Sequence, residues 1–460
     1  MLTYKLEKKP GLPLYESLYR CIRADILSGR LSPGEKLPSK RALAENLQVG
    51  KTTVEAAFAQ LTAEGFLRSK EKVGYFVEAL PLPPAKPPIP PSSSAPAEAF
   101  VADLTSGGGC RFPFTAWSRL QRQVFLDYGE KLLQPLPNRG IPELRRAIAA
   151  HLADFRGMAV DPENILIGAG TDFLYNLLIQ LLGRDLVYAV EEPGYGKIRK
   201  VYAAAAARCV DAPMDSRGVR PDLLGQADVL HISPAHHFPT GIVTPLSRRQ
   251  ALLSWARTGD KWIIEDDYDS EFRFRSLNLP AMQSLDPERV IYMNTFSKSL
   301  APSIRISYMV LPSGLMKRFQ ENLGFYSCTV ASFEQYTLAR FLSQGYFEKH
   351  INRMRKFYRL RRSKLTAMLE GLPGIRVLEQ EAGLHFLVEL TTSLSDSALV
   401  QTLSSRGVRA EALSGFYHTK QQDLHRLVVD YSCLEEGAFQ KAVEVLREIA
   451  GNGGKFSVDS

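Results

Sequence analysis

Apolar residues recur at the spacing of amphipathic helices in the first 79 of the chain's 460 residues. A first helix begins near Pro13, where proline suits the start of a helix, and shows one apolar face. A second helix follows Ser39, whose hydroxyl suits an N-cap, and a third follows the break at Val49-Gly50 and ends near Gly65. The apolar positions of the three helices are Leu14, Leu18, Ile22, Ile26, Leu43, Leu47, Val54, Ala57, Phe58 and Leu61.

Two short apolar runs after the third helix predict a β-hairpin. Phe66-Leu67 and Tyr75-Phe76-Val77 flank the polar run from Arg68 to Lys72. Three helices followed by a hairpin with a basic tip are the layout of a winged helix-turn-helix, which reads DNA with a helix in the major groove. Residues 1–79 are therefore predicted to form a DNA-binding domain.

Proline marks the boundary of this domain. Eight prolines lie between positions 81 and 96, and the residues among them are mostly small. Proline lacks an amide donor, so this segment can join neither a helix nor the interior of a sheet. Residues 80–99 are predicted to be a linker that spans roughly 50 Å when extended.

The pattern changes after the linker to short apolar runs separated by helical stretches. This alternation predicts a mostly parallel sheet covered by helices on both faces, in an α/β domain over residues 100–450. The strand-like runs are Ile165–Ile167, Leu186–Val190, Val229–Ile232, Trp262–Ile264 and Val290–Met293.

Charge and cysteine usage narrow the functional classes. The net charge is +8, and within residues 1–79 thirteen Lys or Arg stand against nine Asp or Glu, which favours an anionic partner for the first domain. The alternative for residues 1–79 is an alanine-rich helical unit that mediates dimerisation and has a charged, solvated face. Five scattered cysteines indicate neither a disulfide framework nor a zinc site, and no run is apolar enough to span a membrane. These features predict a cytoplasmic protein.

The unusual residues of the large domain fall where strands end, which is where α/β folds bind ligands. Lys298 follows the run 290–293 and could react with an aldehyde cofactor, while Arg305 and nearby hydroxyls could hold a phosphate. Carboxylates and a phenol follow another strand at 265–268, and an acid there could pair with a pyridine nitrogen. A surface cluster of acids is the simpler alternative.

Three further strand ends carry candidate side chains. The turn 168–172 leads into a helix whose N-terminus could bind a phosphate, and Tyr195 could stack on a ring. The adjacent His236 and His237 point apart and have no third ligand, so no metal site is expected.

The run from Leu37 to Leu67, L-P-S-K-R-A-L-A-E-N-L and onward, resembles the GntR-type winged helix almost position by position. Gly50 stands where that family often has a serine cap, and Lys72 where the wing usually has a glycine. Together, charge, capping and resemblance predict the DNA-binding residues Ser39, Lys40, Arg41, Lys51, Thr52, Thr53, Lys70 and Gly74.

The large domain resembles fold-type I aminotransferases, and the whole chain resembles the MocR/GabR-type subgroup of the GntR regulators. The resemblance rests on H-x-F-P-T-G at 236–241, E-D-D-Y-D-S-E-F at 265–272 and T-F-S-K-S-L-A-P-S-I-R at 295–305. It implies pyridoxal 5'-phosphate as the cofactor and a smaller C-terminal α/β subdomain.

The resemblance also implies a role for each matching residue. Lys298 would form the internal aldimine and act as the catalytic lysine, Asp266 or the adjacent Asp267 would pair with the pyridine nitrogen, and Tyr268 would contact the ring oxygen. Further cofactor contacts would come from Tyr195, Gly170, Thr171, Thr295 and Arg305, and Arg426 would grip a carboxylate of the effector. Phe238 replaces the asparagine of aminotransferases, and Pro135 stands about where a partner subunit's tyrosine often reaches the phosphate.

Three functions fit these features. We expect a transcriptional regulator that binds operator DNA, forms a homodimer and senses pyridoxal phosphate itself or an amine or amino acid. An active aminotransferase with an accessory DNA-binding domain is the alternative, and a regulator that has lost the cofactor is the third. The effector stays open among vitamin B6, gamma-aminobutyrate, other amino acids and taurine-like amines.

Overall fold

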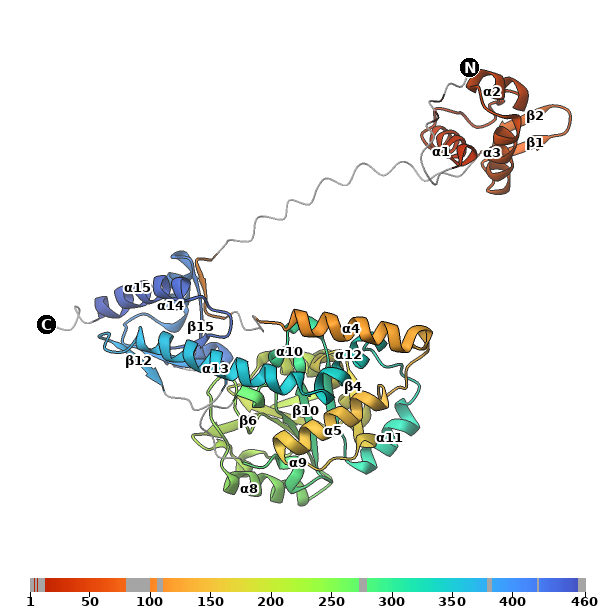
Figure 1. The fold of residues 1–460 in the computed structure, drawn as a ribbon. Helices are drawn as coiled ribbons and strands as arrows, with labels where there is room; N and C mark the ends of the chain where they lie inside the picture. Colours follow the sequence, from red (N-terminus) through yellow and green to blue (C-terminus); the bar gives the residue numbers. More distant parts are fainter. Residues whose placement is uncertain are drawn as a thin grey trace. The chain divides into compact units, whose positions relative to one another are not determined.

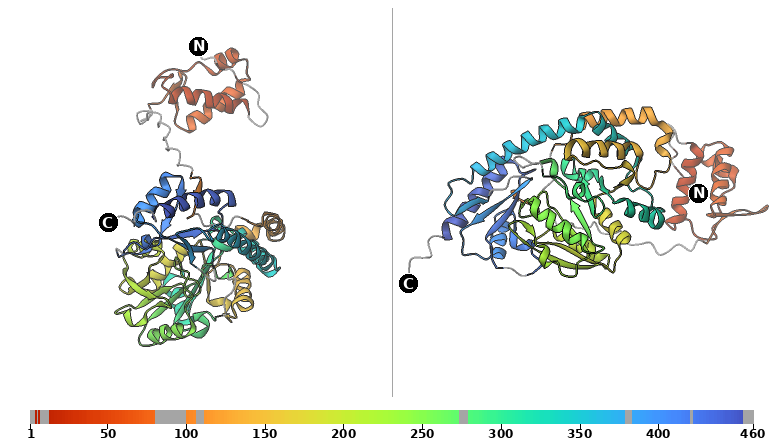
Figure 2. Two further views of the ribbon diagram at one scale, coloured as in Figure 1. Left: turned by 90° about the vertical axis from the view of Figure 1, so that its left-hand side faces the viewer. Right: turned by 90° about the horizontal axis from the view of Figure 1, so that it is seen from below.

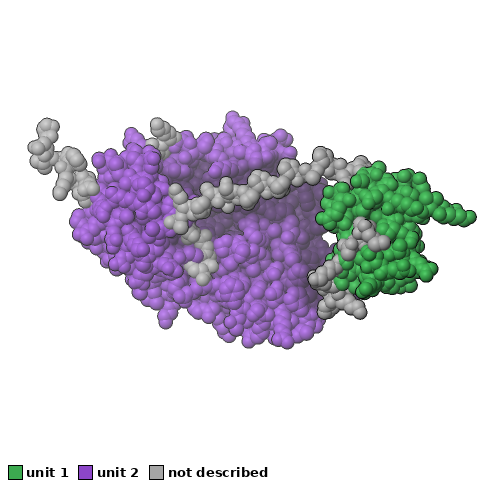
Figure 3. Space-filling model, turned by 90° about the horizontal axis from the view of Figure 1, so that it is seen from above, with its two compact units in different colours: residues 1–97 green, residues 98–460 purple. Residues whose placement is uncertain are grey.

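The computed structural model describes Tyr4, Leu6 and residues 13–79, 100–105, 111–272, 279–378, 383–419 and 422–453. Contacts divide the chain into two compact units, residues 1–97 and 98–460, which have separate colours in Figure 3. The predicted linker, 80–99, lies outside the described residues.

The first unit contains the three predicted helices and the hairpin (Figure 1). Its core is a single cluster in which Leu18 and Ile22 of the first helix meet Val54 and Phe58 of the third, all of them fully buried. The elements are α1 (Leu14–Leu27), α2 (Lys40–Leu47), α3 (Lys51–Ala63), β1 (Leu67–Lys70) and β2 (Gly74–Val77). The periodicity of the apolar residues therefore predicted the order and type of every element here.

The hairpin differs from the prediction in where its turn begins. Leu67 pairs with Val77 and Lys70 with Gly74, so the first strand continues through residues that the polar sequence suggested were part of the tip. A strand with one face in solvent needs few apolar residues, and only Leu67 is buried on β1. The tip is thus confined to residues 71–73.

The second unit is built on an eight-stranded sheet in the order β4-β11-β10-β9-β8-β5-β6-β7. Neighbouring strands from β10 to β6 run parallel, as predicted, whereas β11 and β7 are antiparallel to the strands beside them. The bounds are β4 (Ile165–Gly168), β5 (Val187–Glu192), β6 (Arg208–Asp215), β7 (Gly218–Val219), β8 (Val229–Ile232), β9 (Trp262–Asp266), β10 (Val290–Thr295) and β11 (Ser307–Val310).

Helices cover both faces of this sheet (Figures 1 and 2). Alternate strand residues serve opposite faces: Ile165 and Ile167 pack into one apolar cluster and Leu166 into another. The helices are α4 (Phe114–Tyr128), α5 (Pro142–Arg156), α6 (Thr171–Leu182), α7 (Gly196–Ala204), α8 (Leu246–Arg257), α9 (Met282–Leu285), α10 (Phe296–Ser299), α11 (Ser313–Leu323) and α12 (Ser332–Ser343), with short 3-10 turns at Gly129–Leu133 (η1), Pro162–Asn164, Pro221–Leu223, Ser270–Phe272 and Pro302–Ile304.

A smaller antiparallel sheet in the order β12-β13-β16-β15 forms the predicted C-terminal subdomain. The helix α13 (Tyr346–Ala367) runs from the large part of the unit to this sheet, where Tyr358 contacts Tyr431 with ring centroids 6.4 Å apart (Figure 2, right). The remaining elements are β3 (Ala102–Asp103), β12 (Ile375–Leu378), β13 (His385–Leu390), α14 (Asp396–Ser405), β14 (Val408–Arg409), β15 (Glu411–Ala412), a 3-10 turn at Leu413–Phe416, β16 (Arg426–Asp430) and α15 (Glu436–Gly453).

The described cysteines differ in their bonding, and one bonded residue among them is not the framework of bonds that the sequence argued against. Cys433 is disulfide-bonded, whereas Cys21, Cys209 and Cys328 carry free thiols. Within the described residues, no helix is long and apolar enough to cross a membrane.

Candidate functional site

The surface of the first unit that resembles a DNA-reading element is formed by the starts of α2 and α3. The Ser39 hydroxyl accepts a hydrogen bond from the Ala42 amide at 3.2 Å and so caps α2. Gly50 precedes α3 and offers no side-chain cap. The Thr53 amide donates to the Gly50 carbonyl at 3.0 Å, and no side chain of the N-cap residue competes for the amides of Lys51 and Thr52, which suits an external anion.

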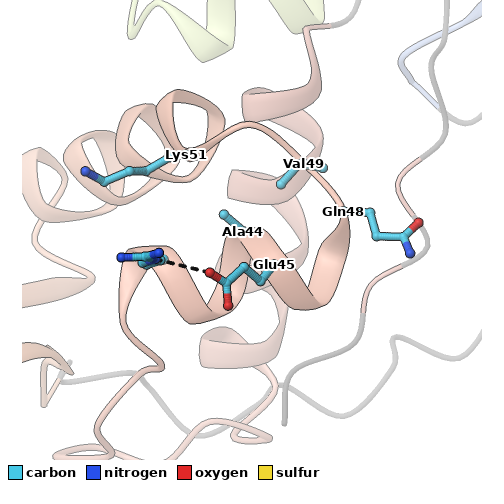
Figure 4. A pocket seen from close by; sticks show the side chains of 6 residues that line it. Ala44, Glu45, Gln48, Val49 and Lys51 are labelled. Atoms are coloured by element: carbon cyan, nitrogen blue, oxygen red, sulfur yellow. Dashed lines mark hydrogen bonds and ion pairs between the residues drawn. The ribbon is translucent and has the colours of Figure 1, made fainter.

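The cations of this surface are exposed and only loosely paired. Arg41, whose side chain is 86% exposed, contacts Glu45 at 3.2 Å, and Lys51 contacts Glu55 at 3.7 Å. Figure 4 shows a hollow between these helices, lined by Lys51, Glu45 and neighbouring residues, with the ion pair of Arg41 and Glu45 dashed. Pairs of this kind contribute little to stability, so the cations can turn to phosphates at small cost.

The predicted threonines and wing residues lie around the same helices. Thr52 is exposed and Thr53 is half-buried on the first turn of α3. Lys40 lies over the ring of Tyr75 at 5.2 Å, and Lys70 lies over Phe76 at the same distance. Tyr75 and Phe76 both belong to β2, so the wing packs against the cations that the sequence assigned to DNA.

The wing turn explains the glycine positions. Gly74 has a φ of +132°, and a Cβ there would meet the Lys36 side chain at 3.2 Å. Lys72 has a φ of +58°, in the left-handed region that glycine adopts without cost. The family's glycine at this position therefore has a conformational reason, and lysine occupies a strained backbone here.

In the second unit, α6 begins at Thr171 beside the side chain of Arg305. The Arg305 guanidinium donates to the Ala169 carbonyl at 3.4 Å and contacts Asp172 at 3.3 Å. It lies so close to Gly170 that a Cβ there would fall 2.2 Å from a guanidinium nitrogen. The structure thus brings Gly170, Thr171 and Arg305 together at one helix N-terminus, an arrangement that suits a phosphate.

Thr295 ends β10 and caps the short helix that carries Lys298. Its hydroxyl oxygen accepts from the Ser297 amide at 3.1 Å, and Ser307 on the neighbouring strand donates to the same oxygen at 2.8 Å. Thr295 therefore fixes the turn on which Lys298 stands.

Asp266 ends β9 and lies in a buried network. Its Oδ2 accepts from the Tyr175 hydroxyl at 2.5 Å and lies 3.6 Å from His231 Nε2, while Tyr202 contacts the other nitrogen of His231 at 2.6 Å. Its Oδ1 is buried and has no hydrogen-bond partner among the described residues. One carboxylate oxygen is held in place, and the other is available to a ligand.

Asp267 has a different environment. It is 1% exposed, contacts Arg156 at 3.0 Å and accepts a hydrogen bond from the Tyr292 hydroxyl at 2.7 Å. The two adjacent acids point to opposite sides of the strand. Asp267 joins the strand to α5, and only Asp266 has an unpartnered oxygen.

Lys298 is partly exposed, and its Nζ lies 3.9 Å from Asp430, which ends β16. Burial raises the pKa of Asp430, whereas the Lys298 charge lowers it. Tyr268 lies nearby, with its hydroxyl 3.2 Å from His236 Nδ1, and that nitrogen contacts Asp269 at 2.8 Å. Burial first, and then the charge of Asp269, raises the pKa of the Tyr268 phenol, so this phenol keeps its proton.

Tyr195 and Phe238 form an aromatic pair in the second unit. Tyr195 is 49% exposed, and its ring stands edge-on to Phe238 with centroids 6.0 Å apart. Burial raises the pKa of Tyr195, and the charges that act on it include those of Asp172, Asp266 and Arg305. Tyr195 is therefore close enough to Asp266 and to Arg305 for both charges to affect its phenol.

The structure does not bring Arg426 to Lys298. Arg426 begins β16, and Asp430, the residue near Lys298, ends it, which is about 13 Å along a strand. The Arg426 guanidinium contacts Glu389 at 2.8 Å, and Glu389 also binds Arg376. A carboxylate of the chain itself therefore occupies this arginine.

Sequence reasoning missed several residues of this site. Tyr175 lies 91 positions before Asp266 and meets it only because α6 packs across the sheet. His231 could have been noticed as a polar residue inside a buried strand, and Asp430 as an acid at a strand end. His236 contacts Tyr268 and Asp269, and no group of three or more His, Cys, Asp or Glu suited to a metal occurs within the described part of the chain.

Comparison with known families agrees with this division. Residues 14–77 match the model of bacterial regulatory proteins of the gntR family, and residues 101–446 match that of aminotransferases of class I and II. The chain thus joins a DNA-binding unit to an aminotransferase-like unit.

Curated relatives match this chain over most of its length. The chain is 36% identical to the uncharacterized HTH-type transcriptional regulator YdeL of Bacillus subtilis, over 95% of this chain and 97% of that protein. It is 31% identical to the probable rhizopine catabolism regulatory protein MocR of Rhizobium meliloti, over 96% and 94% respectively. It is also 31% identical to the pyridoxine biosynthesis regulator PdxR of Corynebacterium glutamicum, over 86% and 87%.

The chain belongs to the gntR family and, within it, to the MocR-type regulators that carry an aminotransferase domain. It is a DNA-binding transcriptional regulator. Among solved structures, kynurenine aminotransferase from Pyrococcus horikoshii matches the fold with a TM-score of 0.68 and 24% identity, covering 79% of this chain and 93% of that one.

Proposed function

We propose that this regulator binds pyridoxal 5'-phosphate in the second unit, with Lys298 as the residue that holds it covalently. The observation that carries the proposal is the buried, unpartnered Oδ1 of Asp266, which suits a protonated pyridine nitrogen. The contact between Gly170 and Arg305 offers a place for a phosphate at the start of α6. Lys298, Asp266 and Arg305 thus suit the aldehyde, the pyridine nitrogen and the phosphate of the cofactor, respectively.

When bound, the cofactor supplies an aldehyde that reacts with primary amines and a ring that withdraws electrons. Lys298 would provide the amine, and Asp430 beside it could hold a proton at Nζ. Tyr175 and His231 would orient Asp266, and Tyr268 would donate its hydroxyl to the ring oxygen because its proton is retained. Thr171, Thr295 and Tyr195 would complete the contacts.

The effector is proposed to be the cofactor itself or an amine that competes with Lys298 for it. The ion pair between Arg426 and Glu389 means that a ligand carboxylate must displace Glu389 before it reaches that arginine. This favours an effector that does not depend on Arg426. Transamination has no need of a gntR-type unit, so activity of that kind would be secondary.

A homodimer is proposed as the working form. Four large apolar side chains of the second unit are more than half exposed on and just after α4. An exposed apolar surface of this kind is typical of an interaction site. They are Phe114, Phe125, Leu126 and Leu133.

The test uses the full chain, loaded with pyridoxal phosphate and reduced with borohydride, which fixes the cofactor on its lysine. Mass spectrometry of the peptides should then find the added mass at Lys298 in the wild type and none in Lys298→Ala. Lys317→Ala, at an exposed lysine on α11, is the matched control and should behave as the wild type. Equal modification of Lys298→Ala, or none in the wild type, refutes the cofactor proposal.

DNA binding provides a separate readout. Neutralising Arg41 and Lys51 should weaken operator binding and reduce its salt dependence by roughly two in the log–log slope, or four for a dimer. Binding that is insensitive to both substitutions would refute the assignment of these residues to DNA.

A further inference from the structure

The long helix α13 of the second unit exposes a row of cations. Lys349, Arg353, Lys356 and Arg359 are all exposed and follow one another at spacings of four, three and three residues, which places them on one helix face. The helix lies along the outer edge of its unit in Figure 2 (right, cyan). Over this length the row spans about 15 Å.

None of these four side chains forms an ion pair with another described residue. By contrast, Arg355 and Arg361 turn toward the protein and donate to the carbonyls of Glu271 and Ser432. Farther along, Lys364 is neutralised by Glu436 at 3.1 Å. The helix therefore has one set of basic residues that support the fold and a second set that faces outward.

The outward set is unfavourable for the helix itself. Like charges three and four positions apart repel one another, and the acid on this part of the helix, Glu348, stands at the edge of the row. An anionic partner would remove this repulsion. Leu360 is the large apolar side chain exposed on this face, so the face offers little for the apolar centre of a protein interface.

We propose that this α13 face binds the phosphate backbone of duplex DNA that flanks the half-sites read by the winged helices. The proposal rests on the DNA-binding function of the chain. Duplex DNA presents roughly nine phosphate charges along 15 Å of its axis, a density that a row of long, mobile cations can follow. Contacts of this type add affinity without adding sequence specificity.

The experiment measures operator binding of the full chain as a function of salt on two duplexes. One contains only the half-sites, and the other adds about 20 base pairs on each side. The test variant is K349Q/R353Q/K356Q/R359Q, and the matched control is R184Q/K200Q/R208Q/K441Q, which removes four exposed cations scattered over other elements. Circular dichroism melting verifies that each variant is folded.

The wild type and the control should bind the longer duplex more tightly and with a steeper salt slope. The α13 variant should lose this gain, with a slope smaller by at least two and about 10-fold to 100-fold weaker binding to the long duplex, and should bind the short duplex as the wild type does. Retaining the charge in R353K/R359K should preserve the gain. If the α13 variant keeps the full advantage of the long duplex, the proposal is wrong, whereas failure of the wild type on both duplexes contradicts DNA binding by the chain instead.

Discussion

The proposed DNA-binding surface of the first unit and the proposed cofactor site of the second are built in opposite ways. On the first unit, Arg41 and Lys51, which are proposed to contact DNA, are exposed and pair with residues four positions away, as Arg41 does with Glu45. On the second unit, Asp266 is buried and held by Tyr175, which is 91 positions away. The surface can therefore change residue by residue with little effect on stability, whereas the buried site couples ligand binding to the fold.

The two adjacent acids at the end of β9, Asp266 in the strand and Asp267 just after it, give the largest expected effect. Asp267→Ala should destabilise the second unit by about 3–5 kcal/mol, because it leaves the buried Arg156 without its carboxylate. Asp266→Ala should cost only about 1 kcal/mol, since it removes one hydrogen bond from Tyr175, yet it should abolish tight binding of pyridoxal phosphate.

Urea unfolding of the cofactor-free protein and equilibrium titration with the cofactor separate the two effects. Glu45→Ala on the first unit is the control and should change the free energy of unfolding by less than about 0.5 kcal/mol. If both aspartate variants lost the same stability, the division of roles between the two acids would be wrong.

The second prediction concerns the pH dependence of stability that a buried acid, Glu271, causes in the second unit. Burial raises the pKa of Glu271 to about 8, above its ordinary value near 4.5. The folded protein thus binds a proton that the unfolded chain releases, so stability falls as pH rises from about 4.5 to 8. Glu271→Gln should be more stable than the wild type at pH 7, on the order of 3 kcal/mol, and equal to it near pH 4.

Urea midpoints measured across this pH range verify the prediction for Glu271. A difference between the two proteins that did not change with pH would exclude proton uptake as its cause. Glu45→Gln on the exposed surface of α2 should show almost no pH-dependent difference.

The smallest expected effect is on the stability of the first unit and comes from Lys72, in the turn of the β1–β2 hairpin. Lys72→Gly relieves a left-handed backbone and should stabilise the first unit by up to about 1 kcal/mol. Removing the charge should at the same time weaken DNA binding slightly, so stability and affinity should move in opposite directions. Thermal melting measures the stability of the variant, and titration with operator DNA measures its affinity. A lower stability of Lys72→Gly would contradict the proposal that the backbone of Lys72 is strained.

The same contrast explains how much the sequence could predict. The helices of the first unit depend on local periodicity and capping, so α1 begins at Leu14, directly after the expected Pro13, and Ser39 caps α2. The predicted turn of the hairpin started too early because an exposed strand has no apolar signature beyond Leu67. Local patterns therefore predict elements well and their ends less well.

In the second unit, the pattern of apolar runs predicted the parallel sheet, but it did not predict which side chains contact one another at the strand ends. Strand ends predicted Lys298 and either Asp266 or Asp267 as cofactor residues, and our preference for Asp266 rests on the different environments of the two side chains. The contact of Lys298 with Asp430 and the pairing of Arg426 with Glu389 depend on the small sheet, whose register no local pattern reveals. Contacts between distant strands are properties of the topology.

Asp172 supplies a carboxylate to Arg305 at the start of α6, where a phosphate is proposed to bind. It contacts both Arg305 and Lys197, so neither cation is left without a counter-ion when no phosphate is bound. A phosphate that bound there, as proposed, would compete with the Asp172 carboxylate for both cations. If the proposed binding of pyridoxal phosphate holds, a regulator that senses cofactor supply would have to persist in the cell both empty and full, and this carboxylate would keep the empty protein free of an unpaired cation cluster.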